Sequence, residues 1–304
     1  MGKQKALHTE RSKEKMRRAE SHVSTDGLPE FSRKTVFVNY AELAAVAKRS
    51  IFLIARFRQV DENETRVTTL GTGFLVGNGR MMTCSHVMNN QEAGHEPHQD
   101  GDLYMFLMRD ENGHMHQSAP ITLKMGETVF DYPAQDVSVI YLPRDFYFDA
   151  KGRMVHHPDD YLVLANNPRD IGADIGVLGY PMQAIGFTPE GSLDIGQVFI
   201  RGDRGIVNTR YANNGVFYYE FTVAFNPGNS GGPIFDIESG EVIAMVHAYR
   251  SVPIKFAKEP VPEELQGEFG ATEVVSVVRS TYSLGLASQN YTKLAKEHGV
   301  CFGD

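Results

Sequence analysis

The stretch Asn-Pro-Gly-Asn-Ser-Gly-Gly-Pro at residues 226–233 decides how the rest of the chain is interpreted. Ser230 stands among glycines, which lack side chains, so the backbone can turn sharply there and bring N–H groups up to a reacting carbonyl. The same residue types also build ordinary surface turns. A serine nucleophile needs a base to take its proton and a carboxylate to orient that base. The chain must therefore supply a histidine and an aspartate in suitable settings.

Both partners occur next to segments with strand character. His86 ends the run Thr-Cys-Ser-His at residues 83–86, shortly after the glycine-spaced apolar segment at residues 71–76. Asp136 opens residues 136–142, DVSVIYL, whose alternation predicts a half-buried strand. The sequence thus predicts a triad of His86, Asp136 and Ser230. In the structural alternative, His86 is a buried core histidine and Asp136 caps a strand end.

These segments resemble those of the trypsin-like serine proteases, which have the chymotrypsin fold, and most closely the bacterial HtrA-like and glutamyl-endopeptidase-like branches. The resemblance spans residues 45–280 and rests on five motifs in the family's order: GTGFLV (71–76), TCSHV (83–87), DVSVI (136–140), GYP (179–181) and NPGNSGGP (226–233). It implies an all-β fold of two six-stranded antiparallel Greek-key barrels with an N-terminal and a C-terminal helix. It also implies a serine endopeptidase that works through an acyl-enzyme.

The expected domain organisation follows from this resemblance. It comprises a basic, partly disordered extension at residues 1–36, a protease domain at 37–285 with its barrel boundary near 155–172, and a C-terminal helix and tail at 286–304. Helix formers at residues 38–49 predict the first helix, with Asn39 as its N-cap. No room is left for the PDZ domain that many HtrA-like proteases append.

Local patterns predict several further elements. Strands are expected at residues 50–57, 103–108, 174–179, 197–200, 216–222 and 241–249. Residues 250–269 predict a long, proline-containing loop, either a surface insertion or a segment that shapes substrate recognition. Residues 274–298 predict the closing helix, because apolar and polar residues mix there at helical spacing.

Charge and cysteine content bound the setting of the protein. The chain carries a net charge of −8, and residues 1–34 hold nine Lys or Arg against five Asp or Glu, which leaves −8 − 4 = −12 for the remainder. The acidic remainder of the chain argues against binding to nucleic acid. The basic segment at residues 1–34 also lacks the interleaved aromatic residues on which bases would stack. The sequence contains no apolar run of about 18 residues, so it predicts no membrane span. Two cysteines, no secretory signal and no expected disulfide indicate a cytoplasmic protein.

The resemblance also assigns the substrate-binding groups. The backbone N–H groups of Gly228 and Ser230 would form the oxyanion hole. The S1 pocket would be lined by Ala224, Phe225, His247, Ala248, Tyr249 and Gly270. A histidine at this point favours Glu, Asp or Gln at P1, since an imidazole can donate to either group. Phe225 replaces the threonine that such relatives carry, so a medium apolar P1 residue stays open, with His247 then structural.

Cofactors and metals are not expected. Paired histidines occur at His95 and His98, His114 and His116, and His156 and His157, but two-histidine spacing is a weak signal without cysteines. The expected partner is a peptide or protein substrate, with an activating protein conceivable at the N-terminal extension or the 250–269 loop. Two other functions remain open: a non-catalytic protein-binding module of the same fold, and an esterase using the same triad.

Overall fold

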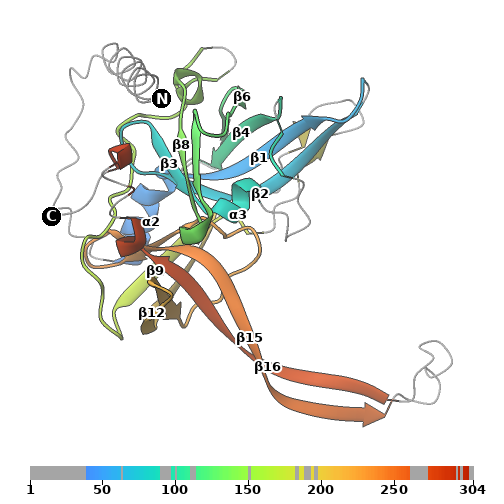
Figure 1. The fold of residues 1–304 in the computed structure, drawn as a ribbon, viewed down its shortest axis with the longest axis vertical. Coiled ribbons are helices and arrows are strands. Elements are labelled where there is room, and N and C mark those ends of the chain that lie inside the picture. The colour runs from blue at the N-terminus through green and yellow to red at the C-terminus, as the bar shows by residue number, and fades with distance from the viewer. Residues whose placement is uncertain are drawn as a thin grey trace, which may run out of the picture. The chain divides into compact units, whose positions relative to one another are not determined.

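The computed structural model describes residues 39–62, 64–89, 97–99, 101–109, 114–149, 152–181, 185–187, 193–194, 198–260, 273–291, 294 and 297–300. The predicted extension at residues 1–36 lies outside them. Most of the described chain is strand, arranged as one sheet and one closed barrel (Figure 1). The structure therefore has the predominantly β character that the sequence predicts.

The first half of the described chain forms an eight-stranded sheet. Its strands are β1 (Ile51–Gln59), β2 (Thr65–Leu75), β3 (Arg80–Thr83), β4 (Leu103–Arg109), β5 (Met115–Gln117), β6 (Ile121–Thr122), β7 (Val129–Tyr132) and β8 (Val137–Tyr141). They follow the order β5-β4-β1-β2-β3-β8-β7, and β6 pairs with β4. Every pairing is antiparallel.

This sheet differs from the predicted six-stranded barrel. The end strands β5 and β7 do not pair with each other in the part of the chain that the structure describes. Strands β5 and β6 both lie along β4, and Pro120, just before β6, has no N–H to donate to a continuous ladder. The edge beside β4 is thus split into two short strands, which accounts for one of the two strands that the sheet has beyond the six predicted.

The second half forms a closed barrel of six strands. Its order is β12-β13-β16-β15-β14-β9, with β9 (Asp174–Gly179), β12 (Arg201–Asn213), β13 (Val216–Phe221), β14 (Pro233–Asp236), β15 (Val242–Pro260) and β16 (Glu273–Ala287). Asn214 and Gly215, both at positive φ, make the two-residue turn between β12 and β13. A separate hairpin pairs β10 (Gly186–Phe187) with β11 (Leu193–Asp194). The strand predicted at 197–200 is absent from the described residues 198–200.

Two further predictions fail at the end of the barrel. Much of the expected loop at 250–269 continues β15 to Pro260, and most of the expected helix at 274–298 is strand β16, paired with β15 from Ala287 opposite Ala244 to Glu273 opposite Pro260. Figure 1 shows the two strands running together beyond the rest of the barrel. The segment EVVSVVRSTYS is rich in β-branched residues, which favour strands over helices. Helical residues follow only at η4 (Ser288–Tyr291) and at 294, 297 and 298 of the described tail.

The N-terminal helix α2 (Tyr40–Ala47) packs on the barrel and continues into η1 (Lys48–Ser50). It begins at Asn39, whose side chain accepts a hydrogen bond from the Glu42 N–H at 3.1 Å. The Tyr40 ring fills the space above Gly176, where a Cβ would lie 2.2 Å from the ring, and its hydroxyl donates to Val177 O at 2.7 Å. The missing side chain in β9 thus fixes where the helix sits.

The remaining helical turns are short and lie around the first sheet. They are α3 (Ser85–Asn89), η2 (Pro133–Gln135) and η3 (Arg144–Tyr147). One large hydrophobic cluster spans the sheet and reaches into the barrel through Leu178, Phe235 and Met245, and a second fills the barrel itself. Among the described residues, no helix combines the length and apolar character needed to cross a membrane.

Candidate active site

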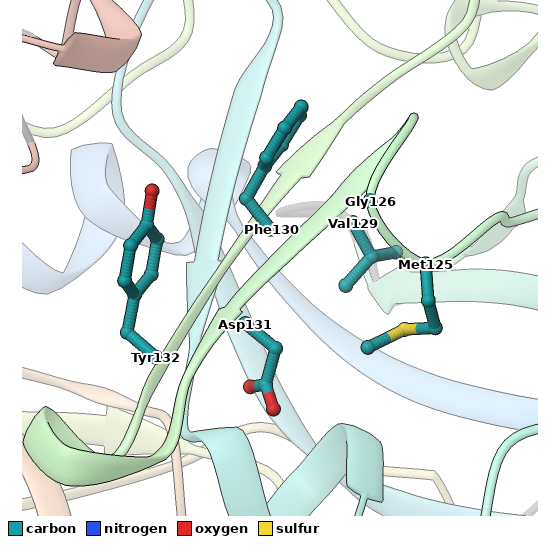
Figure 2. Close-up of a pocket in the computed structure, with 6 residues that line it drawn as sticks. All are labelled: Met125, Gly126, Val129, Phe130, Asp131 and Tyr132. Atoms are coloured by element: carbon teal, nitrogen blue, oxygen red, sulfur yellow. The ribbon is translucent and has the colours of Figure 1, made fainter. Parts of the chain in front are cut away.

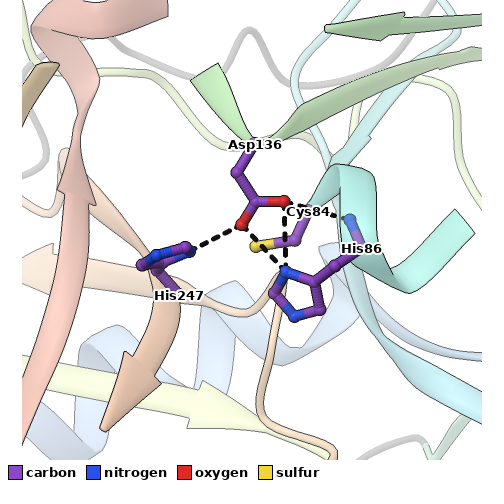
Figure 3. A group of neighbouring side chains, drawn as sticks. All are labelled: Cys84, His86, Asp136 and His247. Atoms are coloured by element: carbon purple, nitrogen blue, oxygen red, sulfur yellow. Dashed lines mark hydrogen bonds and ion pairs between the residues drawn. The ribbon is translucent and has the colours of Figure 1, made fainter. Parts of the chain in front are cut away.

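His86 and Asp136 meet at the end of the sheet that faces the barrel strand β15. His86 lies in α3, directly after β3, and Asp136 lies between η2 and β8. The His86 Nδ1 is 2.8 Å from Asp136 Oδ2, and the His86 backbone N–H donates to Oδ1 at 3.0 Å (Figure 3). Asp136 adopts a left-handed conformation at φ 47°, which aspartate tolerates better than most residues. The turn thereby aims the carboxylate at the histidine ring.

The end of α3 is held in place by a second aspartate. Asp131 in β7 accepts from the Asn89 side chain at 2.8 Å and from the Ser138 hydroxyl at 2.6 Å. Figure 2 shows the Asp131 carboxylate pointing from β7 toward α3. This contact joins the helix that carries His86 to the strands that flank Asp136.

A second histidine binds the same carboxylate. The Nδ1 of His247, in β15, is 2.6 Å from Asp136 Oδ2, on the opposite side from His86 (Figure 3). His247 is the extra residue of a β-bulge, because Val246 pairs with Gly285 and Ala248 with Leu284. Bulges of this kind redirect a side chain next to active sites. The bulge turns His247 toward Asp136.

The two histidines determine the charge of Asp136. Burial alone would raise the pKa of this carboxyl, but hydrogen bonds from His247 and His86 outweigh it and hold the pKa well below its usual range. Asp136 is therefore ionised at neutral pH. An ionised carboxylate only accepts hydrogen bonds, so the Nδ1 of each ring must carry a hydrogen.

Ser230 lies in the loop that joins β13 to β14. Gly228 and Gly231 adopt φ of 92° and 83°, a region that favours glycine. The loop is closed by hydrogen bonds from Asn229 N to Asn226 O at 3.0 Å and from Gly232 N to Asn229 O at 2.8 Å. The glycines therefore shape a tight turn with a half-buried Ser230 at its tip.

Thr72 joins this loop to the sheet that carries His86. Its N–H donates to Ser230 O at 2.9 Å, and its hydroxyl donates to Gly228 O at 2.8 Å. The same hydroxyl accepts from Tyr180 N at 3.0 Å, and Thr72 is fully buried. Thr72 thus holds the carbonyl groups of Gly228 and Ser230, the two residues whose N–H groups are the proposed oxyanion donors.

Gly231 brings the loop against the residues just before His86. A Cβ at Gly231 would lie 2.2 Å from Thr72 O and from Thr83 Oγ1, so only glycine fits. His86 and Ser230 share no hydrogen bond, although both are described. Catalytic hydrogen bonds are often long in ligand-free enzymes and tighten when substrate binds.

A family model for the trypsin-like peptidase domain matches residues 71–245, which is more than half of the chain. The chain belongs to the trypsin-like peptidase family. Among solved structures, it is similar to the Rv3671c protease from M. tuberculosis in its active form, at 18% identity and a TM-score of 0.47, with 91% of this chain and 96% of that chain covered. It is also similar to Deg5, at 19% identity and a TM-score of 0.42, with coverages of 68% and 83%. No curated protein matches the sequence.

The residues predicted for the S1 pocket of this peptidase lie in different settings. The Nδ1 of His247 is bound to Asp136, so Nε2 is the ring nitrogen left to face a P1 side chain. Phe225 is 6% exposed and lies in the barrel core, Ala224 is exposed, and Ala248 is half-buried. The Tyr249 side chain and Gly270 lie outside what the structure describes.

Sequence reasoning missed Thr72 and the role of His247. A signal for Thr72 was available, because it is the one polar side chain in the GTGFLV segment and stands between two glycines. No comparable signal exists for His247, since a bulge leaves no mark in the sequence of one strand. Cys84, two residues before His86, is buried; its Sγ lies 3.2 Å from Val246 O, and burial raises the pKa of its thiol.

Two surface pockets lie away from these residues. One, of about 270 Å³, is lined by Met125, Gly126, Val129, Phe130, Asp131 and Tyr132 (Figure 2). Another, of about 410 Å³, lies over the barrel between Tyr211 and Tyr218. Both Asp131 oxygens already accept hydrogen bonds, so the first pocket offers no free carboxylate.

The histidine pairs noted in the sequence have other contacts where they are described. His98 Nδ1 is 2.7 Å from the Tyr104 hydroxyl, and nearby Asp102 binds both Nε and a terminal nitrogen of Arg58. His156 packs between Phe52 and Phe146. His95 lies outside the described residues.

Proposed function

We propose that the chain is a serine endopeptidase in which Ser230 Oγ attacks the scissile carbonyl and forms an acyl-enzyme. The observation that carries the proposal is the 2.8 Å contact between His86 Nδ1 and Asp136, beside a glycine-shaped loop that presents Ser230. A carboxylate that fixes one imidazole nitrogen leaves the other free to take the serine proton.

The proton transfers follow from this tautomer. With hydrogen on Nδ1, the lone pair of His86 is on Nε2, which accepts the Ser230 proton during attack and returns it to the leaving amine. Asp136 stays ionised and stabilises the imidazolium that forms between these steps. Water then takes the place of the amine and releases the acid product by the same route in reverse.

Two backbone N–H groups are proposed as the oxyanion hole. Gly228 and Ser230 donate to no other protein group within the described residues, so both N–H groups are available to a developing oxyanion. The left-handed conformation of Gly228 aims its peptide, and Thr72 fixes the carbonyl on its other side. Removing one such donor typically costs about 3–4 kcal/mol of transition-state stabilisation.

We propose a medium apolar residue at P1. The case for Glu, Asp or Gln rested on a hydrogen bond donated by His247. Its Nδ1–H is directed at Asp136, so the neutral ring has only an acceptor, Nε2, for a P1 side chain. The described residues of the predicted wall, Ala224, Phe225 and Ala248, offer no charge and no side-chain donor. An apolar side chain therefore suits this wall better than a carboxylate, which would lose its hydration there.

An activating protein partner remains a proposal at residues 1–36 or 250–269. The backbone supports the second place: β15 pairs with β14 only at residues 242–245, and β16 pairs with β13 only at 283–286. Beyond these residues, the described strands leave the outer edges of the β15–β16 hairpin without a partner strand. An added strand from another protein could pair there.

The function is tested by labelling the protein with a fluorophosphonate and profiling a peptide library. We expect one adduct, on Ser230, that is lost in Ser230→Ala, together with peptide cleavage after apolar residues. Ester hydrolysis without peptide cleavage would indicate the esterase instead. If Ser230 is not labelled in a folded protein, the peptidase and esterase proposals are both contradicted and the non-catalytic protein-binding module is favoured. Cleavage after Glu or Gln would overturn the P1 proposal alone.

A further inference from the structure

Four metal-binding side chains gather at the proposed catalytic pair. The Sγ of Cys84, one ring nitrogen each of His86 and His247, and a carboxylate oxygen of Asp136 all lie within 4.8 Å of one another. The Nδ1 atoms of the two rings are 2.8 Å and 2.6 Å from Asp136 Oδ2. Figure 3 shows the Asp136 carboxylate between the two rings, with the Cys84 sulfur beside it. Thiolate, imidazole and carboxylate are the ligands that zinc takes in proteins. Catalysis as proposed above uses two of these four residues and gives no role to Cys84.

We propose that Cys84, His86, Asp136 and His247 bind one zinc ion, which reversibly blocks the active site. Zinc bonds of about 2.0–2.1 Å to nitrogen and about 2.3 Å to sulfur place tetrahedral ligand atoms roughly 3.3–3.6 Å apart. The present spacings lie on both sides of this range, from the 2.6 Å between His247 and Asp136 up to the 4.8 Å limit. Side-chain shifts of about 1 Å or less would therefore bring the four atoms around one ion.

The charges balance in the bound state. Zinc carries two positive charges, the Cys84 thiolate and the Asp136 carboxylate carry one negative charge each, and both imidazoles are neutral. Binding forms one Zn–S, one Zn–O and two Zn–N bonds, displaces water from the ion and releases one proton, from the Cys84 thiol. A neutral complex suits a buried site, since an unbalanced charge there would be costly. The ion can enter past the two rings, because the His86 and His247 side chains are 30% and 27% exposed.

Zinc would change the tautomer on which the proposed mechanism depends. The metal needs the Nδ1 lone pair of each ring, so the hydrogen of each ring moves to Nε2 through solvent. The His86 Nε2 then carries a hydrogen and has no lone pair for the Ser230 proton. Asp136 is also taken from its role of orienting His86. Because four protein ligands close the coordination shell, the site has the character of a structural zinc site, without an open position for catalysis.

The site also ties together the two halves of the molecule. Cys84, His86 and Asp136 come from the ends of sheet elements, whereas His247 comes from barrel strand β15. Because the ligands come from both halves, a bound metal would hold the sheet and the barrel in one relative position. The inhibition arm of this proposal rests on the proposed function, but the binding arm does not.

The binding arm is tested with the full-length Ser230→Ala protein, stripped of metal and titrated with Co²⁺ and then Zn²⁺. We expect one Co²⁺ per chain, with the d–d absorption of a tetrahedral ion and a thiolate-to-cobalt charge-transfer band, both abolished when Zn²⁺ displaces it. Cys84→Ser should lose the charge-transfer band, and Cys84→Ser and His247→Asn should each weaken Zn²⁺ binding by about tenfold or more.

His157→Asn is the matched control, because His157 also lies near an aspartate, 3.7 Å from Asp159, but in a group without a cysteine. It should bind Zn²⁺ as the parent protein does. Absence of the charge-transfer band in folded Ser230→Ala, or an unchanged Zn²⁺ affinity in Cys84→Ser, would overturn the proposal. The first of these readouts needs no ligand variant, so misfolding of a variant cannot mask it.

The inhibition arm uses the protein with Ser230 intact. Zn²⁺ should reduce peptide cleavage, and the reduction, taken relative to each protein's own metal-free rate, should be about tenfold weaker in Cys84→Ser. A cobalt band without any peptidase activity would leave the metal site standing and refute the proposed function. Peptidase activity without the cobalt charge-transfer band would support the proposed function and refute the metal site.

Discussion

The two halves of the molecule hold their parts of the site in different ways. On the sheet side, Asp136 is fixed by hydrogen bonds from the rings of His86 and His247, so charge and proton position decide its contribution. On the barrel side, Ser230 is presented by Gly228 and Gly231, so the absence of side chains decides it. The sheet half should therefore be sensitive to loss of charge at constant shape, and the barrel half to added volume at constant polarity.

Among substitutions outside the His86–Ser230 pair, removing the charge on the sheet side should have the largest effect. Asp136→Asn keeps the shape, but its amide cannot hold His86 with hydrogen on Nδ1, so we expect kcat for peptide cleavage to fall about 10⁴-fold. Asp159→Asn, at an exposed aspartate, is the control and should leave kcat unchanged. A kcat within tenfold of wild type in Asp136→Asn would mean that charge on this side does not govern the reaction.

Adding one methyl group on the barrel side should come next. In Gly231→Ala, the Cβ would lie 2.2 Å from Thr72 O at φ 83°, so the loop must move, and we expect kcat to fall about 100- to 1,000-fold through loss of oxyanion donors. Stability should drop by about 2–5 kcal/mol in urea unfolding.

The control for this variant is Gly215→Ala. Gly215 has nearly the same φ, 80°, but no atom lies within 4 Å of its would-be Cβ. It should therefore show only the conformational cost, about 1–2 kcal/mol, with normal kcat. Equal losses of stability in the two variants would show that close packing of the loop is not what holds it.

Breaking the link between the halves should have a smaller effect. Thr72→Val keeps the shape but leaves Gly228 O and Tyr180 N without their partner, and each such buried group costs about 1–3 kcal/mol. We expect kcat to fall about 10- to 100-fold as the loop relaxes. Thr72→Ser retains the hydroxyl and should recover most of the activity; a Ser variant as impaired as the Val variant would assign the effect to packing.

The smallest effect is on stability alone, away from the site. His156 is 4% exposed, and burial, together with nearby His116, lowers its pKa to about 3. Below the unfolded-state pKa of about 6.5, the unfolded chain binds a proton that the folded chain does not, so stability falls as pH falls from about 6.5 toward 3. At pH 5 the loss should be about 2 kcal/mol relative to pH 7.

His156→Leu should remove this part of the pH dependence, as measured by urea unfolding at both pH values. His157→Asn, one residue away and half-exposed, should keep it. The same slope in His156→Leu as in wild type would exclude His156 as its source, and no change of kcat is expected in either variant.

The sequence was sufficient for the family and for most strands. Five motifs in order carried the resemblance, and strands such as β9 and β13 lie where alternation predicts them. Local patterns failed where pairing is non-local. Residues 250–260 looked like a loop because prolines interrupt them, yet β16 pairs with them from across the hairpin. Residues 274–287 were predicted as helix from their spacing, against the preference of their valines.

The site was predictable where one residue type is required and unpredictable where register matters. A serine among glycines and an aspartate before a strand also occur in ordinary turns and caps, so Ser230 and Asp136 could be singled out only because their motifs follow the family's order. The position of His247 depends on one extra residue in β15, which changes the face of the strand it occupies. The meeting of Cys84 with His247 depends on the same bulge and on packing between the sheet and the barrel.

The central claim is that His86 on the sheet and Ser230 on the barrel act as one catalytic unit. The most direct measurement is kcat for His86→Ala, Ser230→Ala and the double variant on one peptide substrate. Residues that act as a unit are non-additive, so each single variant should lose about 10⁶-fold and the double variant no more than either. A double variant whose loss is the product of the two single losses, or a Ser230→Ala protein that still cleaves peptide, would contradict the account.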